Sequence, residues 1–240
     1  MTTDPRARLE RVLGPLSPAW EDLLDRDPEF VEAFAGYLAA CHDATVLRPH
    51  IRELLLLAHD ATMTVLDERG VDLRIGRALD AGATEREVLD VLELLTLIST
   101  HSLTTGIPLV PVDAEPPAPE STRGGYWAAF EERFPGYHAR MAALMPEAFA
   151  AYRGLGRVLW RSEGLPLKWR ELVFVVADLS TTHLFRDGAA LHVANALRYG
   201  ATRAEVVAAI GLTVPYTART LEIGVAALAR RLGAPKPPPA

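Results

Sequence analysis

The strongest evidence for the fold is the stretch RELVFVVADLSTTHLFRDGAALHVANALRYGATRAEV, which runs from Arg170 to Val206. Shifted by 118 positions, it aligns without a gap with RELLLLAHDATMTVLDERGVDLRIGRALDAGATEREV, which runs from Arg52 to Val88. Of the 37 aligned positions, 15 are identical. Similarity that holds at one fixed offset over this length indicates an internal repeat. We therefore interpret the chain as a tandem duplication.

Within each copy the pattern is typical of α-helices. The segments Arg52–Thr64 and Arg170–Thr182 are apolar on nearly every side, which predicts a helix buried inside a bundle. Gly82 and Gly200 suit the left-handed position that follows the last turn of a helix. After each glycine a Thr-x-x-Glu capping box predicts the start of a further helix. No stretch alternates as a strand does, so the predicted class is all-α, with two similar helical bundles in tandem.

The repeat and the prolines together predict the domain boundaries. We expect a first repeat over 1–112 and a second repeat over 125–232. The segment 113–124 between them is rich in proline and predicts an extended linker. The tail 233–240 also contains a proline cluster, and we expect it to be disordered.

Composition excludes several classes of protein. The 240 residues carry 25 Lys and Arg against 31 Asp and Glu, a net charge of −6, which argues against a nucleic-acid-binding face. No apolar stretch approaches the ~20 residues of a membrane span, and MTTDPRARLERV at the N-terminus does not have the pattern of a secretion signal. A single cysteine, Cys41, excludes an intramolecular disulfide and a CxxC pair. We therefore expect a cytoplasmic protein.

The repeated segments resemble the carboxymuconolactone decarboxylase family, which includes the alkylhydroperoxidase D branch. The resemblance is carried by the REL helix, by His192 eight residues before Gly-Ala-Thr, and by Glu205. The first copy is degenerate, because Arg74 stands at the position of His192. The resemblance implies an all-helical fold that assembles into trimers or hexamers, with sites where repeats or subunits meet.

The chain departs from the peroxidase branch at the redox residues. In that branch two cysteines precede the motif histidine by seven and four residues. Here those positions hold Phe185 and Gly188, and the first copy has Asp67 and Gly70. A dithiol peroxidase must form and resolve a sulfenic acid or disulfide, which one distant cysteine cannot do alone. We therefore do not expect thiol peroxidase activity.

Three histidines are the candidate catalytic residues. His192 matches the motif histidine and suits proton transfer near neutral pH, although a surface or interface histidine left from ancestry would look the same. His183 lies where the buried helix meets a loop, a usual place for a site residue, but it could also cap that helix. His101 has apolar surroundings, which also fits a hydrogen-bonded core histidine.

The two copies keep different members of this set. Val65 and Arg74 align with the two loop histidines of the second copy, and Arg219 aligns with His101. One hypothesis is that the complete site combines His101, from the first copy, with His183 and His192. The other site would then hold the three replacement residues. The alternative is neutral drift at unrelated positions.

Other residues are weaker candidates. Arg186 and Arg219 are possible anion binders, and Phe185 and Thr182 are possible contacts to substrate. Residues shared by both copies are more often structural. The shared Arg-Glu pairs are therefore interpreted as salt bridges that hold each repeat together: Arg52 with Glu53 and Arg170 with Glu171. No HxxxH, HxH or HExxH spacing exists, so we predict neither a metal nor a cofactor.

The resemblance implies a cofactor-independent acid–base enzyme, a lyase of decarboxylase type, acting on a small carboxylated or lactone-type organic acid. An isomerase, cyclase or hydrolase with the same acid–base pair is also compatible, and the alternative from another class is a non-catalytic small-molecule binder or scaffold. The expected partners are a small-molecule substrate and further copies of the chain, without nucleic acid or membrane. Because the two buried helices are apolar on many faces, we expect a homo-oligomer, with a trimer favoured over a dimer.

Overall fold

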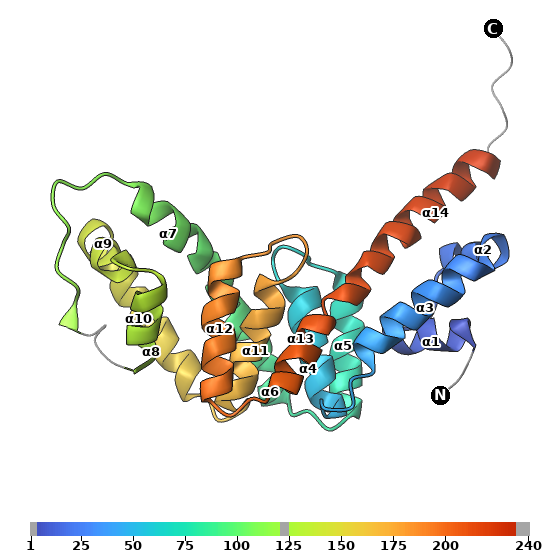
Figure 1. Cartoon of the computed structure of the whole chain (residues 1–240), viewed down its shortest axis with the longest axis horizontal. Coiled ribbons are helices and arrows are strands. Elements are labelled where there is room, and N and C mark those ends of the chain that lie inside the picture. The colour runs from blue at the N-terminus through green and yellow to red at the C-terminus, as the bar shows by residue number, and fades with distance from the viewer. Residues whose placement is uncertain (1–3, 121–124, 234–240) are drawn as a thin grey trace, which may run out of the picture.

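The computed structural model describes residues 4–120 and 125–233, and these residues form α-helices and short 3-10 turns without a strand (Figure 1). The predicted all-α class is therefore confirmed. The helices of the first half are α1 (Pro5–Leu13), α2 (Pro18–Arg26), α3 (Pro28–His42), α4 (Pro49–Ala61), α5 (Glu68–Asp80), α6 (Glu85–Leu95) and α7 (Thr100–Gly106). Those of the second half are α8 (Gly125–Arg133), α9 (Tyr137–Leu144), α10 (Pro146–Arg161), α11 (Leu167–Asp178), α12 (Arg186–Arg198), α13 (Arg203–Gly211) and α14 (Ala218–Gly233).

Local sequence signals set several helix ends. Gly82 and Gly200 have φ angles of 94° and 90°, so each takes the left-handed conformation that glycine adopts without strain. The side chains of Thr84 and Thr202 then accept hydrogen bonds from the amides three residues later, and the glutamates there bond back to the threonine amides. Both predicted capping boxes are thereby confirmed.

The buried helices α4 and α11 pack against each other at the centre of the molecule (Figure 1). They end at Ala61 and Asp178, three and four residues before the predicted ends. The chain turns back at these points, because the amide of Asp67 donates to the carbonyl of Asp60 over 2.9 Å, and the amide of Phe185 donates to that of Asp178 over 2.8 Å. The apolar pattern continues into the turn and does not mark where the helix stops.

The two turns that follow have the same backbone. Leu66 and Leu184, at equivalent positions of the repeat, have φ angles of 47° and 50°. A Cβ atom added to Gly70 would lie 2.6 Å from the Asp60 carboxylate, and one added to Gly188 would lie 2.5 Å from the Asp178 carboxylate. Both glycines therefore let a buried aspartate approach the backbone closely. These equivalences support the proposed duplication.

Each end of the molecule is built from both halves of the chain. At one end α14 packs along α2, and the indole of Trp20 donates to Glu222 over 3.2 Å (Figure 1). At the other end Ile107, which follows α7, joins a cluster with Phe130 and Tyr137 from the second half. The terminal part of each repeat has thus crossed to the other repeat.

A single large core runs through both halves, because α4, α6, α11 and α13 contribute to one continuous cluster of buried residues. The repeat boundaries therefore do not separate independently packed bodies. Within the linker 113–124, the described residues 113–119 contain no helix, and 121–124 lie outside the described residues. Of the predicted tail 233–240, Gly233 still belongs to α14 and the rest lies outside the described residues. No described helix combines the length and the apolar character that a membrane span needs.

Candidate active site

The structure brings His101 and His183 into direct contact. His101 lies in α7 and His183 lies in the turn between α11 and α12, 82 positions later in the chain. Nδ1 of His101 lies 2.7 Å from Nε2 of His183, and the ring planes are within 9° of parallel. Nε2 of His101 lies 3.4 Å from the carboxylate of Asp178. The crossing of the two repeats is what places these groups together.

His192 forms a second polar pair close by. Its Nδ1 lies 2.7 Å from Oε2 of Glu171, and both side chains are buried. The ring of Phe174 stacks on the imidazole with 4.6 Å between centroids. Burial alone lowers the pKa of His192, but the hydrogen bond and the charge of Glu171 outweigh it, so the net pKa is raised. The pair therefore favours the protonated form of His192.

The imidazoles of His101 and His183 are neutral at neutral pH. Burial, together with the charges of the two neighbouring histidines, lowers the pKa of His101 to about 3. Burial also lowers the pKa of His183. Asp178 is fully buried, and burial raises its pKa to about 7. Since both imidazoles are neutral, one of the two facing nitrogens carries the hydrogen and the other accepts it.

A small aromatic pocket adjoins the histidines. His101 and His192 line it together with four phenylalanines, and its volume is about 30 Å³. These phenylalanines are Phe130, Phe134, Phe174 and Phe185. Phe185 covers one face of His101, with 4.1 Å between ring centroids. Apolar walls around a few convergent polar groups are typical of a small-molecule site.

A larger pocket of about 190 Å³ shares a wall with the first. Leu97, Tyr126 and Tyr152 line both pockets. Beyond them the larger pocket has Trp127, Trp160, Arg153 and Arg157. The guanidinium carbon of Arg153 lies 3.8 Å from the ring centroid of Trp127, which is a close cation–π contact. An aromatic chamber with two cationic side chains therefore leads to the histidine pocket.

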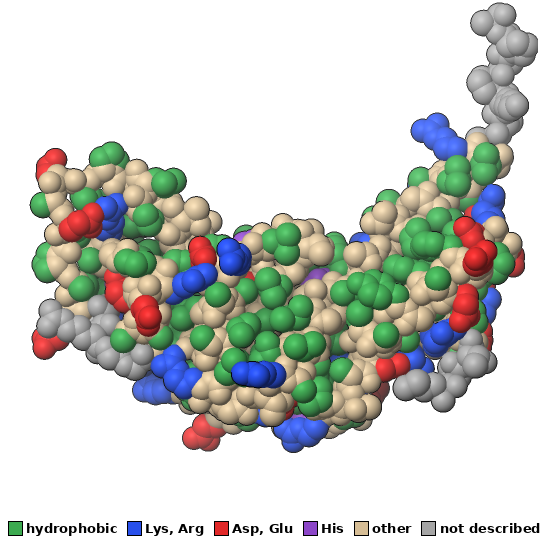
Figure 2. Space-filling model, viewed as in Figure 1, with side chains coloured by type: hydrophobic (Ala, Val, Ile, Leu, Met, Phe, Trp, Pro, Cys, Tyr) green, Lys and Arg blue, Asp and Glu red, His purple; other side chains and the backbone are tan. Residues whose placement is uncertain are grey.

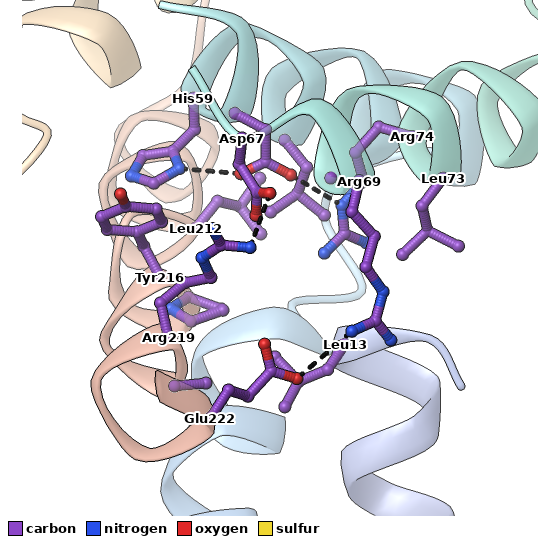
Figure 3. A pocket seen from close by; sticks show the side chains of 15 residues that line it. Leu13, His59, Asp67, Arg69, Leu73, Arg74, Leu212, Tyr216, Arg219 and Glu222 are labelled. Atoms are coloured by element: carbon purple, nitrogen blue, oxygen red, sulfur yellow. Dashed lines mark hydrogen bonds and ion pairs between the residues drawn. The ribbon is translucent and has the colours of Figure 1, made fainter. Parts of the chain in front are cut away.

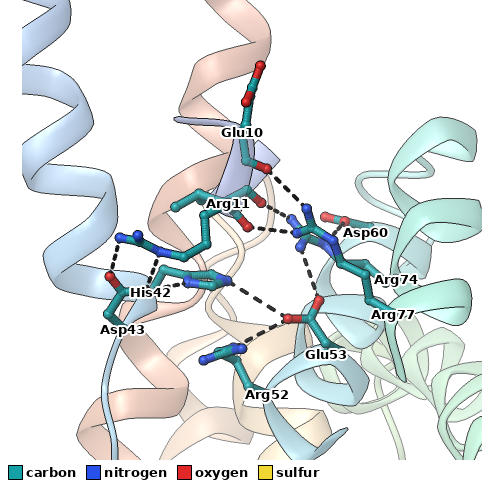
Figure 4. Close-up of polar contacts among 10 residues, drawn as sticks. Glu10, Arg11, His42, Asp43, Arg52, Glu53, Asp60, Arg74 and Arg77 are labelled. Carbon is teal, nitrogen blue, oxygen red and sulfur yellow. Dashed lines mark hydrogen bonds and ion pairs between the residues drawn. The ribbon is translucent and has the colours of Figure 1, made fainter. Parts of the chain in front are cut away.

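The first repeat has a counterpart pocket in which the polar positions are charged (Figure 3). Arg74 replaces His192, and Arg219 replaces His101 and pairs with Asp67 over 2.8 Å. Arg74 lies between Glu53 and Asp60, at 3.2 and 3.3 Å (Figure 4). This pocket is held together by permanent ion pairs and has no pair of facing imidazoles.

The structure separates the predicted site residues into two groups. Phe185 lies with the three histidines, whereas Arg219 lies in the counterpart pocket. Arg186 is exposed at the start of α12 and does not line the histidine pocket. Thr182 is exposed, and its hydroxyl lies 3.3 Å from that of Ser180.

One interpretation of the shared residues is wrong in the second repeat. Arg52 and Glu53 do pair, at 3.3 Å. The guanidinium of Arg170 instead donates to backbone carbonyls, those of Leu159, Ser162 and Leu165. Glu171 is thereby released from its neighbour and faces His192.

Sequence reasoning missed Glu171 and Asp178 as members of the site, because both are shared by the two repeats and were taken as structural. A signal was available in the sequence, because the second repeat has His192 where the first has Arg74. In the first repeat Arg74 pairs with Glu53 and Asp60, which are equivalent to Glu171 and Asp178. Without an arginine, the two buried acids of the second repeat need other partners.

Residues 146–231 match the carboxymuconolactone decarboxylase family. A crystal structure from Burkholderia xenovorans, described as a candidate gamma-carboxymuconolactone decarboxylase subunit, is similar over 95% of this chain and 97% of that one. The two share 33% sequence identity and superpose with a TM-score of 0.83. No protein of curated function matches.

Proposed function

Since the chain belongs to the carboxymuconolactone decarboxylase family, we propose that it is an acid–base enzyme acting on a small carboxylated or lactone-type organic acid, with decarboxylation as the reaction. The observation that carries this proposal is the buried pair of Glu171 and His192 at the wall of an aromatic pocket. A protonated imidazole held by a buried carboxylate is a general acid poised to deliver a proton into that pocket.

The proposed reaction transfers one proton from His192 to the substrate. Loss of CO2 breaks the bond between the carboxyl carbon and a carbon conjugated to the lactone carbonyl, and the electron pair passes into that carbonyl as a dienolate. The imidazolium of His192 then gives its proton to a carbon of the dienolate. His192 is left neutral beside Glu171, and a proton from solvent restores it. An isomerase, cyclase or hydrolase would use the same donor.

The neutral pair of His101 and His183 has a different task in this proposal. One N–H of the pair donates a hydrogen bond to the dienolate oxygen, which stabilises the negative charge that develops there. Because neither imidazole is charged at neutral pH, the pair does not compete with His192 for the role of acid. No organic cofactor is needed for these steps.

The larger pocket supplies a place for the substrate carboxylate. Arg153 and Arg157 lie at this pocket with the rings of Trp127 and Trp160. A guanidinium binds a carboxylate through two parallel hydrogen bonds, and the indoles can pack against a planar, unsaturated ring. We therefore propose these two arginines, in place of Arg186 and Arg219, as the anion-binding groups.

The experiment that tests the function compares wild type with His192→Ala. Purified protein is incubated with candidate lactones and carboxylated intermediates, and substrate loss and product mass are followed by mass spectrometry. His59→Ala is the matched control, because it removes a buried imidazole that is paired with a carboxylate, at 3.0 Å from Asp60, from the counterpart pocket. Turnover lost in His192→Ala and kept in His59→Ala supports the enzyme. Binding without turnover in all three proteins would favour the non-catalytic binder.

We also propose a homo-oligomer, with a trimer favoured over a dimer. The reason given from sequence is wrong, because α4 and α11 bury each other inside one chain. Apolar side chains nevertheless gather over the central helices on the face shown in Figure 2, and Val207 and Ile223 are 68% and 63% exposed. The Burkholderia protein is described as a subunit. Light scattering that gives a 26 kDa monomer at micromolar concentration would exclude both assemblies. A cytoplasmic location, which cell fractionation tests, is part of the same proposal.

A further inference from the structure

Three side chains beside the pocket have the chemistry of metal ligands. His101, Asp178 and His183 each offer a nitrogen or oxygen atom, and these atoms lie within 4.8 Å of one another. They come from α7, from the end of α11 and from the turn that follows it. Because the three are distant in sequence or separated by irregular spacing, no ligand motif marks them.

The carboxylate of Asp178 is an unusual member of this group. The side chain is fully buried, and neither oxygen has a hydrogen-bond partner within the described part of the chain. Nε2 of His101 lies 3.4 Å from one of these oxygens. A buried carboxylate without a partner is strongly unfavourable. Either a proton or a cation must therefore satisfy it.

The first repeat shows how the same fold satisfies the equivalent carboxylate. Asp60 occupies the position of Asp178 and pairs with Nε of Arg74 at 3.3 Å and with Nδ1 of His59 at 3.0 Å. The second repeat has no such guanidinium, since His192 stands at this position and is paired with Glu171. One repeat therefore has a built-in cation beside this aspartate, and the other does not.

The two imidazoles beside Asp178 stand where the counterpart pocket has other residues. Val65 occupies the position of His183, and Arg219, which pairs with Asp67, occupies the position of His101. The carboxylate without an arginine partner is thus the one that is accompanied by two nitrogen ligands. A proton alone on Asp178 would not require this pair.

We propose that His101, Asp178 and His183 bind one divalent first-row transition-metal ion, such as Zn²⁺ or Fe²⁺. Two imidazoles and one carboxylate favour these ions over Mg²⁺ and Ca²⁺, which prefer oxygen ligands. Two ligand atoms that are each about 2.1 Å from a tetrahedral ion lie roughly 3.4 Å from each other. Nε2 of His101 and a carboxylate oxygen of Asp178 have this separation.

The nitrogen of His101 that faces Asp178 is Nε2, whereas Nδ1 of His101 lies 2.7 Å from Nε2 of His183. Binding of the ion through Nε2 of His101 therefore requires the hydrogen bond between the two imidazoles to break and the ring of His183 to turn toward the ion. His183 is free to make this small movement, because it is only half buried and lies in the turn between two helices. The same exposure gives the ion a path from solvent.

A bound ion would keep positions open for water or for a substrate oxygen, and it would act there as a Lewis acid. It could take over from the imidazole N–H the stabilisation of an enolate oxygen. Metal binding goes beyond the proposed function and does not rest on it, because the proton donor in that proposal is the separate pair of Glu171 and His192. Either proposal can fail while the other stands.

The test measures binding and not turnover. Protein is stripped of metal with a chelator, dialysed, and titrated with Zn²⁺ in a calorimeter and with Co²⁺ in a visible spectrometer. Wild type should bind one ion per chain. Bound Co²⁺ should give the visible absorption bands of an ion that has a low coordination number and nitrogen and oxygen ligands. His50→Ala, which removes a histidine that lines neither pocket, should behave as wild type.

Two variants decide the outcome. His183→Ala and Asp178→Asn should each weaken Zn²⁺ binding by more than the roughly 10–100-fold that loss of an outer-shell partner causes. His183 lies in a turn and is half buried, so its replacement should keep the fold even if Asp178→Asn does not, and circular dichroism checks both. Absence of uptake by wild type would overturn the proposal, and so would equal affinity in wild type and His183→Ala.

Discussion

Replacing Glu171 by glutamine should remove the proton donor of the site, which is the protonated form of His192, while the imidazole itself stays in place. The variant keeps an oxygen that accepts the hydrogen from Nδ1 of His192, but it loses the negative charge that holds the pKa of His192 above its ordinary value. Burial then acts alone and lowers that pKa. His192 should therefore become neutral at pH 7. A histidine titration followed by NMR measures this change directly.

The stability of the variant should depend on pH with a definite sign. The folded-state pKa of His192 is raised, so the pair stabilises wild type fully below the pKa of an exposed histidine, about 6.5. This contribution is lost as the pH rises through the folded-state pKa. A charged hydrogen bond contributes about 1.5–3 kcal/mol and a neutral one about 1 kcal/mol. Glu171→Gln should thus lower the free energy of unfolding by about 1–2 kcal/mol at low pH, and by less at high pH.

The kinetic effect follows from the lost acid. General acid catalysis contributes about 10²–10⁴-fold to a rate, so kcat should fall by about that factor in both Glu171→Gln and His192→Ala. Because the two side chains act as one unit, the double variant should be no slower than His192→Ala. The reasoning is refuted if His192 keeps its titration in Glu171→Gln, or if the two losses multiply in the double variant.

Three further changes test the surroundings. Gly156→Leu places a bulky side chain in the aromatic chamber, and the fold accepts a leucine at the equivalent buried position of the first repeat, Leu38. KM should therefore rise at least about tenfold with little loss of stability. An unchanged KM would show that the chamber is not part of the substrate site. Gly188→Ala would bring a Cβ to 2.5 Å from the Asp178 carboxylate, so thermal unfolding should show a loss of about 1–3 kcal/mol. Cys41→Ser should leave hydroperoxide turnover at background, since burial raises the pKa of this thiol and makes it a poor nucleophile; peroxide reduction that depends on Cys41 would contradict the proposed chemistry.

The sequence was sufficient to predict the helices of the repeated segments, although not all of their ends, because their signals are local. The capping boxes and the glycines after helices act within a few residues, and the apolar segments around Arg52 and Arg170 could only be buried helices. The resemblance to the decarboxylase family led to His192. The expectation that His101 joins His183 and His192 came from comparing the repeats, and the 2.7 Å contact between His101 and His183 agrees with it.

Long-range contacts could not be predicted in the same way. Arg170 and Glu171 are adjacent in sequence, but consecutive residues of a helix point in different directions. The guanidinium therefore reaches backbone carbonyls while the carboxylate reaches His192 in the next helix. In the same manner Arg219 pairs with Asp67, 152 positions away in the chain. It therefore lines the counterpart pocket and not the pocket of His101 and His192. Such pairings depend on how the two repeats cross.

The crossing of the repeats also sets the order in which the protein can be completed during synthesis. The indole of Trp20 is bonded to Glu222 in α14, 202 residues later. A ribosome that adds about 5–20 residues per second needs roughly 10–40 s between finishing α3 and finishing α14. During that interval the side of α2 that α14 covers is without this partner. A chain that ended before Ala218 would leave Trp20 without its hydrogen bond to Glu222 and the cluster of α1, α2 and α3 without the contact of Ala218.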